Sequence, residues 1–189
     1  VVYESTVYPG TTKFLIQNYL NKYSKLKEGK DFFVGYSPER VNPGDTKHSI
    51  SKIKKILAIS APEKIRIKVR KVYKQISKKL ILTNSIESAE TAKVIENIQR
   101  DLNIAFINDI LIFADKMNYN FNEILRLAST KWNFLNFKPG LVGGHCLPVD
   151  PHYLNYVANF NKIKLKTLLA GRDVNNSMKK FVLNRILDK

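Results

Sequence analysis

The sequence contains one cysteine, Cys146, among 189 residues. A single thiol cannot form an internal disulfide, which is compatible with a reducing cytoplasm, where we expect the protein to be located. No run of 18 apolar residues is present, so we expect no membrane-spanning helix and no membrane partner. The first residues, VVYESTVYPG, lack the basic-then-apolar order of a secretory signal peptide.

Acidic residues are half as frequent as basic ones, 16 against 32, which gives a formal net charge of +16. Such a charge is compatible with nucleic-acid binding. The lysines, however, are spread along the whole chain with one denser stretch at 51–80, and aromatic residues do not interleave with them as in a stacking platform. We therefore favour solvated basic faces and expect no nucleic-acid partner.

The first part of the chain alternates between strand and helix patterns. Apolar runs predict strands at 1–5, 31–37 and 53–59, and helical spacing predicts helices at 11–23 and 61–77, the second with Pro62 in its first turn. This alternation is typical of a parallel α/β sheet, although three strands are few for such a fold. We expect the α/β part to span residues 1–82.

Residues 83–189 are predicted to be all-helical. A long helix is expected at 87–117, and Asn120 or Asn122 can cap a second helix that ends near Leu127. A loop follows, and a third helix is expected to start with Asp150 at its N-cap and Pro151 as its first residue. A fourth helix is predicted at 171–187.

Cys146 lies in the segment KPGLVGGHCLPVDPHYL, residues 138–154. The loop setting argues against a core residue, and the place before a predicted helix start favours a nucleophilic thiolate, while the glycines allow close approach of another molecule. A small buried hydrophobic residue is the alternative, and both interpretations stay open at this point. The spacing of Cys146, His145 and His152 fits no usual zinc pattern, so no metal is expected.

Two further groups of polar residues are candidates for chemistry. Lys93 and Asn97 share one face of the long predicted helix, where they could hold an oxyanion or form part of a solvated stripe. Glu39 follows the strand at 31–37, at the strand end where open α/β sheets bind ligands. A turn carboxylate paired with Arg40 is the alternative for Glu39.

The stretches ESTVYPGT, GYSPERVNPGD, AETAKVIENIQRDLNIAFIND and GLVGGHCLPVD occur in this order. Together they resemble the UDP-glucose/GDP-mannose dehydrogenase superfamily, and SPERVNPG and TKWNF are most similar to the branch that acts on UDP-N-acetylhexosamines. The resemblance implies the C-terminal part of a Rossmann-like NAD domain (1–82), then a helical dimerisation domain with a long central helix (83–189). It also implies NAD as cofactor, a UDP-sugar as substrate, a homodimer, and a role in polysaccharide biosynthesis.

The resemblance further implies a two-step oxidation of the sugar C6 alcohol to a carboxylate through a thioester. It assigns Cys146 as nucleophile, Lys93 and Asn97 to oxyanion stabilisation, Asp150 to the associated water network, and Glu39 to general-base catalysis. Ser5, Thr6 and Glu39 are expected to contact the cofactor, with Thr6 also positioning a water molecule. The expected substrate-binding residues are Arg40, Val41, Lys93, Asn97, Lys131, Gly143 and Cys146, with Lys131 donated across the dimer.

The sequence also departs from the family pattern. Pro43 stands where the UDP-glucose branch has a second acid, and Val149 stands where that branch often has a lysine. No G-x-G-x-x-G follows an early strand, so the phosphate-binding turn of a Rossmann domain is missing, and the chain starts with Val rather than Met. We therefore expect a fragment of such an enzyme. The alternative is a non-catalytic, dimer-forming remnant of a split or decayed gene.

Overall fold

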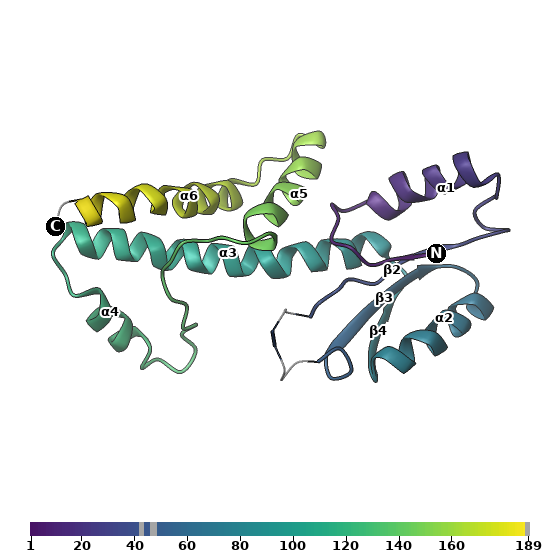
Figure 1. Ribbon diagram of the computed structural model, residues 1–189, viewed down its shortest axis with the longest axis horizontal. Helices are drawn as coiled ribbons and strands as arrows, with labels where there is room; N and C mark the ends of the chain where they lie inside the picture. Colours follow the sequence, from purple (N-terminus) through teal and green to yellow (C-terminus); the bar gives the residue numbers. More distant parts are fainter. Residues whose placement is uncertain (42–43, 46–48, 188–189) are drawn as a thin grey trace. The chain divides into compact units, whose positions relative to one another are not determined.

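The computed structural model describes residues 1–41, 44–45 and 49–187 (Figure 1). Pro43 lies outside these residues. The chain divides into two compact units, residues 1–95 and 96–189, and each is described by itself. This division falls within one helix, α3 (Ile86–Lys116), whereas the boundary predicted from the sequence lies just before it. The domain boundary at residues 82 and 83 stays a prediction.

The first unit contains a mixed four-stranded sheet in the order β1-β2-β3-β4. The strands are β1 (Val2–Tyr3), β2 (Val34–Tyr36), β3 (Lys54–Ser60) and β4 (Lys79–Thr83). The pairs β1–β2 and β3–β4 are parallel, but β2–β3 is antiparallel, so the prediction of a wholly parallel sheet was wrong. A parallel pair needs a long crossover, usually a helix, and the described residues between β2 and β3 form none.

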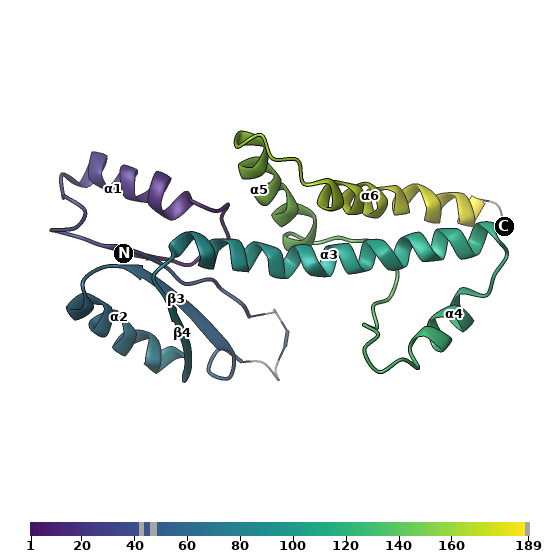
Figure 2. The same ribbon diagram turned by 180° about the vertical axis from the view of Figure 1, so that it is seen from behind.

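Strand β3 is buried on both faces of the sheet, so it builds two hydrophobic clusters. Because side chains alternate along a strand, Ala58 joins one cluster with Tyr36, and Leu57 joins the other with Tyr73. Helices α1 (Gln17–Ser24) and α2 (Glu63–Ile76) lie on opposite sides of the sheet in both views (Figure 1, Figure 2). Full burial of one aliphatic side chain of these clusters, such as Leu57, contributes about 1.5–3 kcal/mol to the free energy of folding.

The local details of the first unit differ from the sequence prediction in three ways. The helix predicted at 11–23 begins as a π-helical turn, η1 (Thr11–Ile16), before α1. Pro62 is the N-cap of α2, which begins at Glu63, rather than a residue of the first helical turn. Strand β4 was not predicted, because it is short, lysine-flanked and largely exposed, and it therefore lacks a clear apolar pattern.

Glu90 on α3 ties this helix to the turn that follows β1. Its buried carboxylate accepts the backbone N–H groups of Gly10 (2.6 Å) and Thr12 (2.8 Å). An exposed ion pair between Lys13 and Glu87 (3.0 Å) spans the same two segments. Gly10 has a φ of 95°, a left-handed conformation that favours glycine. The turn after β1 is therefore held in place by α3.

The second unit is helical, as predicted. Besides α3 it contains α4 (Phe121–Ala128), α5 (Cys146–Phe160) and α6 (Lys166–Leu187), and α6 runs alongside α3 in both views (Figure 1, Figure 2). The two helices approach closely at Gly171, where a Cβ atom would lie 2.3 Å from a methyl carbon of Leu102. None of the helices in the described residues is long and apolar enough to span a membrane.

The helix ends of the second unit correct two predictions and confirm one. Asn120 caps α4 by accepting the N–H of Glu123 (3.1 Å). Helix α5 begins at Cys146 with His145 as N-cap, so Asp150 is not a cap and Pro151 lies inside the helix. Pro148 stands in the first turn, where the missing N–H costs no helical hydrogen bond, which lets the helix start earlier than predicted. Helix α6 starts five residues before the predicted position, at residue 166 instead of 171.

Replacement of Glu90 by Ala should lower the free energy of unfolding by about 1–3 kcal/mol for each backbone N–H that it leaves buried and unpaired. Glu87→Ala is the matched control on the same helix, and it should cost less than about 1 kcal/mol, because its ion pair with Lys13 is exposed. Urea unfolding followed by circular dichroism measures both values. Equal losses in the two variants would contradict the role assigned to Glu90.

Candidate functional site

The carboxyl ends of β1 and β2 bring two of the predicted segments together. The N–H of Ser37 donates to the carbonyl of Tyr3 (2.9 Å), and the N–H of Glu39 donates to the carbonyl of Glu4 (3.3 Å). Parallel pairing therefore continues past the strands, and the turn with Ser5 and Thr6 leaves the sheet beside the loop with Glu39. Ser5 and Glu39 are exposed, and Thr6 is half-buried.

The side chain of Glu39 is fixed by its own loop. Its Oε1 atom accepts the backbone N–H groups of Arg40 (2.6 Å) and Val41 (2.7 Å). The guanidinium of Arg40 donates to the carbonyl of Lys54 (2.9 Å), which anchors the loop to the start of β3. The predicted substrate-binding residues Arg40 and Val41 thus orient the carboxylate of Glu39 through their backbone.

A cluster that the sequence analysis missed lies at the same edge of the sheet. Lys55 is only 2% exposed, and its ammonium lies 3.4 Å from Glu4 Oε1 and 3.4 Å from the carbonyl of Pro38. The Tyr73 hydroxyl donates to Glu4 Oε1 (2.7 Å). Burial, followed by the hydrogen bond and negative charge of Glu4, raises the pKa of Tyr73 above its usual range, so it stays a donor.

This cluster fixes the residues immediately before the predicted cofactor contacts, because Glu4 precedes Ser5 and Pro38 precedes Glu39. A lysine is seldom buried unless it is paired, so Lys55 in an apolar strand gave no clear signal in the sequence. Side chains two residues apart along a strand lie on the same face of the sheet. Lys55 therefore shares its face with the buried residues Leu57 and Ile59, and this alternation could have identified it as buried.

In the second unit the structure places Asn97 and Asp150 in contact. The Nδ2 atom of Asn97 donates to Oδ2 of Asp150 over 2.5 Å, and the two residues are 8% and 3% exposed. The bond joins α3 to α5 across 53 positions of sequence. Asp150 was predicted as a helix cap and as a site residue, and this contact accounts for its burial without the cap.

Cys146 is the first residue of α5, and its side chain is exposed. The first N–H groups of a helix have no intrahelical partner and, with the helix dipole, attract negative charge. Gly143 and Gly144 precede it on an exposed loop, and Gly144 has a φ of 82°. The thiol is therefore open to solvent at the N-terminus of a helix.

The two predicted lysines lie in different units. Lys93 is half-buried and belongs to residues 1–95, one turn before Asn97 on α3, and Lys131 is exposed on the loop after α4. Cys146 belongs to residues 96–189. The proximity of Lys93 to Cys146, and the donation of Lys131 to a second subunit, stay predictions.

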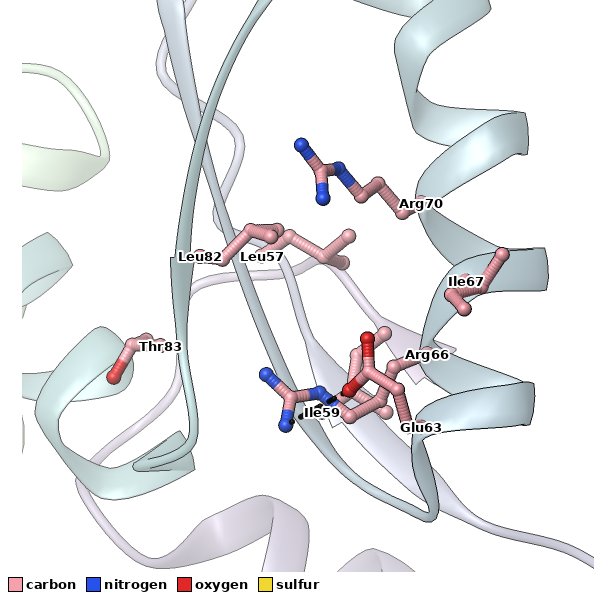
Figure 3. A pocket seen from close by; sticks show the side chains of 8 residues that line it. All are labelled: Leu57, Ile59, Glu63, Arg66, Ile67, Arg70, Leu82 and Thr83. Carbon is pink, nitrogen blue, oxygen red and sulfur yellow. Dashed lines mark ion pairs between the residues drawn. The ribbon is translucent and has the colours of Figure 1, made fainter.

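The first unit also has a narrow cleft. Figure 3 shows it between α2 and the strands β3 and β4, with Arg66 and Arg70 on α2 and Leu57 and Leu82 on the strands. Glu63 pairs with Arg66 over 3.5 Å at its rim. The predicted site residues of the described part of this unit do not line the cleft, so we interpret it as a packing gap between helix and sheet.

Two matches to one protein family cover most of the chain. Residues 1–77 match the NAD binding domain of the UDP-glucose/GDP-mannose dehydrogenase family, and residues 87–177 match its central domain. The chain is 50% identical over 188 residues to protein CapL of Staphylococcus aureus and 47% identical to a UDP-N-acetyl-D-glucosamine 6-dehydrogenase of Pseudomonas aeruginosa. In both comparisons the match covers 99% of this chain but only 44% of the relative.

The fold is also similar to that of solved dehydrogenases. A UDP-D-ManNAc dehydrogenase from Pyrococcus horikoshii matches the whole chain with a TM-score of 0.87 and 34% identity, and the match covers 44% of that protein. An NDP-N-acetyl-D-galactosaminuronic acid dehydrogenase from Methanosarcina mazei Go1 matches with a TM-score of 0.85 and 27% identity, over 42% of its length. With a mixed sheet followed by a helical segment, and with both family domains present in order, the chain belongs to the UDP-glucose/GDP-mannose dehydrogenase family.

Proposed function

We propose that the protein oxidises the C6 alcohol of a UDP-N-acetylhexosamine to the uronic acid in two NAD-dependent steps, with Cys146 as the nucleophile. The observation that carries this proposal is the exposed thiol of Cys146 at the first position of α5, in a helix whose Asp150 is bonded to Asn97. The names of the relatives support the substrate class. We further propose that the reaction takes place in the cytoplasm and supplies polysaccharide biosynthesis.

The proposed reaction consists of two oxidations, which are joined by a covalent intermediate on Cys146. The alcohol is oxidised to an aldehyde, and the thiolate of Cys146 adds to the aldehyde carbon to form a thiohemiacetal. Loss of a second hydride gives a thioester, and water hydrolyses the thioester to the carboxylate and the free thiol. When bound, NAD⁺ accepts the hydride of each oxidation. In total one alcohol, one water and two NAD⁺ give one carboxylate, two NADH and three protons.

The polar residues of the site fit distinct roles in this scheme. The Nδ2 atom of Asn97 carries two N–H groups, of which one is needed for the bond to Asp150, so the second can donate to an oxyanion. Lys93, one helical turn away, would supply a positive charge to the same oxygen. Glu39, fixed by two backbone N–H groups, would act as the general base for the water that hydrolyses the thioester.

The residues present fit part of an NAD site. Ser5, Thr6 and Glu39 lie at the carboxyl edge of the parallel pair β1–β2, where open α/β sheets bind nucleotides. The 189 residues contain no G-x-G-x-x-G segment, so the usual turn for the cofactor phosphates is not supplied by this sequence. The chain spans 44% of the length of the relatives that it matches, and the activity is therefore proposed for the protein of which it is part.

No observation on the described residues favours the alternative, a non-catalytic remnant. The buried pair Asn97–Asp150 argues against it. A buried polar side chain is costly unless it has a partner, and a site without a function has no need to retain a buried polar pair. The exposed thiol of Cys146 has the same implication, since a purely structural cysteine is normally buried.

We also propose that the helical unit forms a homodimer through a stripe on α3. Phe106 (58% exposed), Phe113 (52%) and Met117 (48%) recur at intervals of seven and four residues, which places them on one face of the helix. The buried residues Ile98 and Ala105 lie about a quarter turn around the helix from this stripe. An apolar stripe of this kind on a helix that already has a buried face is suited to a second copy of the chain.

Cys146→Ser should lower the rate of uronate formation by about a thousandfold, because a hydroxyl at neutral pH is a far weaker nucleophile than a thiolate. The measurement is NADH absorbance with UDP-N-acetylglucosamine, UDP-N-acetylgalactosamine and UDP-N-acetylmannosamine, using the complete gene product. Ser177→Ala, which alters an exposed hydroxyl on α6, serves as the control and should retain the wild-type rate. Uronate formation at the wild-type rate by the Cys146 variant would overturn the assignment of the nucleophile.

Phe113→Glu should convert the dimer to a monomer at about 10 µM protein, because a charge would have to be buried in the apolar stripe. Sedimentation velocity measures the oligomeric state. Phe160→Glu is the matched control and should remain dimeric. Phe160 is the last residue of α5, and it is 82% exposed. A dimer that survives Phe113→Glu would exclude the α3 stripe as the interface.

A further inference from the structure

Asn108 on α3 binds the backbone of the loop that leads to Cys146. Its side chain is fully buried, and its Oδ1 atom accepts the N–H of Gly140 over 2.9 Å. Its Nδ2 atom donates to the carbonyl of the same residue over 3.1 Å. One carboxamide therefore pairs with both backbone polar groups of Gly140, in the manner of a strand partner. No role was predicted for Asn108 from the sequence.

The second N–H of Asn108 is used in a buried polar network. It donates to Oδ1 of Asn175 on α6 over 2.9 Å, and Nδ2 of Asn175 donates to Oδ1 of Asp101 over 2.8 Å. The same carboxylate oxygen accepts from Arg172 over 2.6 Å. Because a carboxylate only accepts, Asn175 must present Nδ2 to Asp101 and Oδ1 to Asn108. This is the orientation in which Asn108 also satisfies Gly140.

The segment from Gly140 to Asp150 is thus tied to α3 at both of its ends. Asn108 holds Gly140, and Asn97 holds Asp150. The two anchors are 11 residues apart on α3, or about 16 Å along its axis. Gly143 and Cys146 lie between them in sequence, and neither is buried. With both anchors in place, the exposed glycine-containing loop has a defined start and a defined end.

We propose that Asn108 is a positioning residue for the thiol of Cys146, acting through the backbone of Gly140. This inference rests on the proposed function, because it concerns the residue assigned there as nucleophile. Without the carboxamide, the half-buried hydrogen bonds to the N–H and carbonyl of Gly140 are lost, and Asn97–Asp150 is the remaining anchor of the two. The thiol then samples more orientations at the start of α5, while α5 itself remains attached to α3 through Asn97.

The test uses the 189-residue chain and requires no catalytic activity, because Cys146 is its only thiol. Asn108→Ala should speed amide hydrogen exchange of residues 138–145 at least about tenfold, with the amides of α3 and α6 remaining protected. It should also change the rate constant for alkylation of Cys146 by iodoacetamide at least about fivefold. Both are measured by mass spectrometry under native conditions.

Two matched asparagine variants separate positioning from general destabilisation. Asn103→Ala removes a bond to the carbonyl of Gln99 within α3 and should change neither readout. Asn175→Ala removes the bonds that Asn175 itself makes to α3 but leaves the Arg172–Asp101 bond and the Asn108–Gly140 pair, so it should lower stability with little effect on the loop. If Asn108→Ala fails to fold by circular dichroism, Asn108→Ser, whose side chain cannot bridge both groups of Gly140, replaces it.

The outcomes are distinguishable from those that test the proposed function. Unchanged loop exchange and alkylation in a folded Asn108 variant would overturn the inference, as would equal effects in Asn175→Ala. If both readouts change as expected but the complete gene product oxidises no UDP-sugar, the positioning role stands and the proposed function fails. In an active protein, Asn108→Ala should lower kcat more than it changes KM, because the loop positions the nucleophile rather than the nucleotide.

Discussion

The buried hydrogen bond between Asn97 and Asp150 is the contact on which the proposed site depends. It attaches the helix that begins with Cys146 to α3, and it engages two residues that the chemistry also requires. Buried polar groups cost more when they are left unpaired than they contribute when paired. The bond therefore constrains the site strongly, because any displacement of α5 would break a hydrogen bond between two buried polar side chains.

Helix α3 makes hydrogen bonds from buried polar side chains at several positions along its length. Glu90 holds the turn after β1, Asn97 holds α5, and Asn108 holds the loop before Cys146. Each of these side chains is buried and bonds to a segment distant in sequence. Apolar contacts alone would fix the packing of the helix but not the register of each segment, whereas a directional hydrogen bond does both. The buried polar residues of α3 thus specify where the segments bonded to them lie.

Local patterns predicted the elements more reliably than their pairing. The apolar run at 53–59 predicted β3, and the pattern of residues 87–117 predicted the long helix, because both signals depend on near neighbours. The antiparallel β2–β3 pair and the short strand β4 depend on connections and packing that the local pattern does not carry. The family resemblance supplied Asn97 and Asp150 individually, but their contact is tertiary. Asn108 and Lys55 were missed because an asparagine in a helix and a lysine in a strand are usually exposed.

The central claim is that the thiol of Cys146 bonds covalently to the oxidised C6 carbon of the sugar. The most direct measurement is acid quenching of the complete gene product during turnover with NAD⁺ and UDP-N-acetylglucosamine, followed by mass spectrometry of the peptide that contains Cys146. The account predicts that a fraction of this peptide carries the full added mass of the thioester-linked nucleotide sugar. Steady production of the uronate with an unmodified peptide, at a rate unaffected by prior alkylation of the thiol, would contradict it.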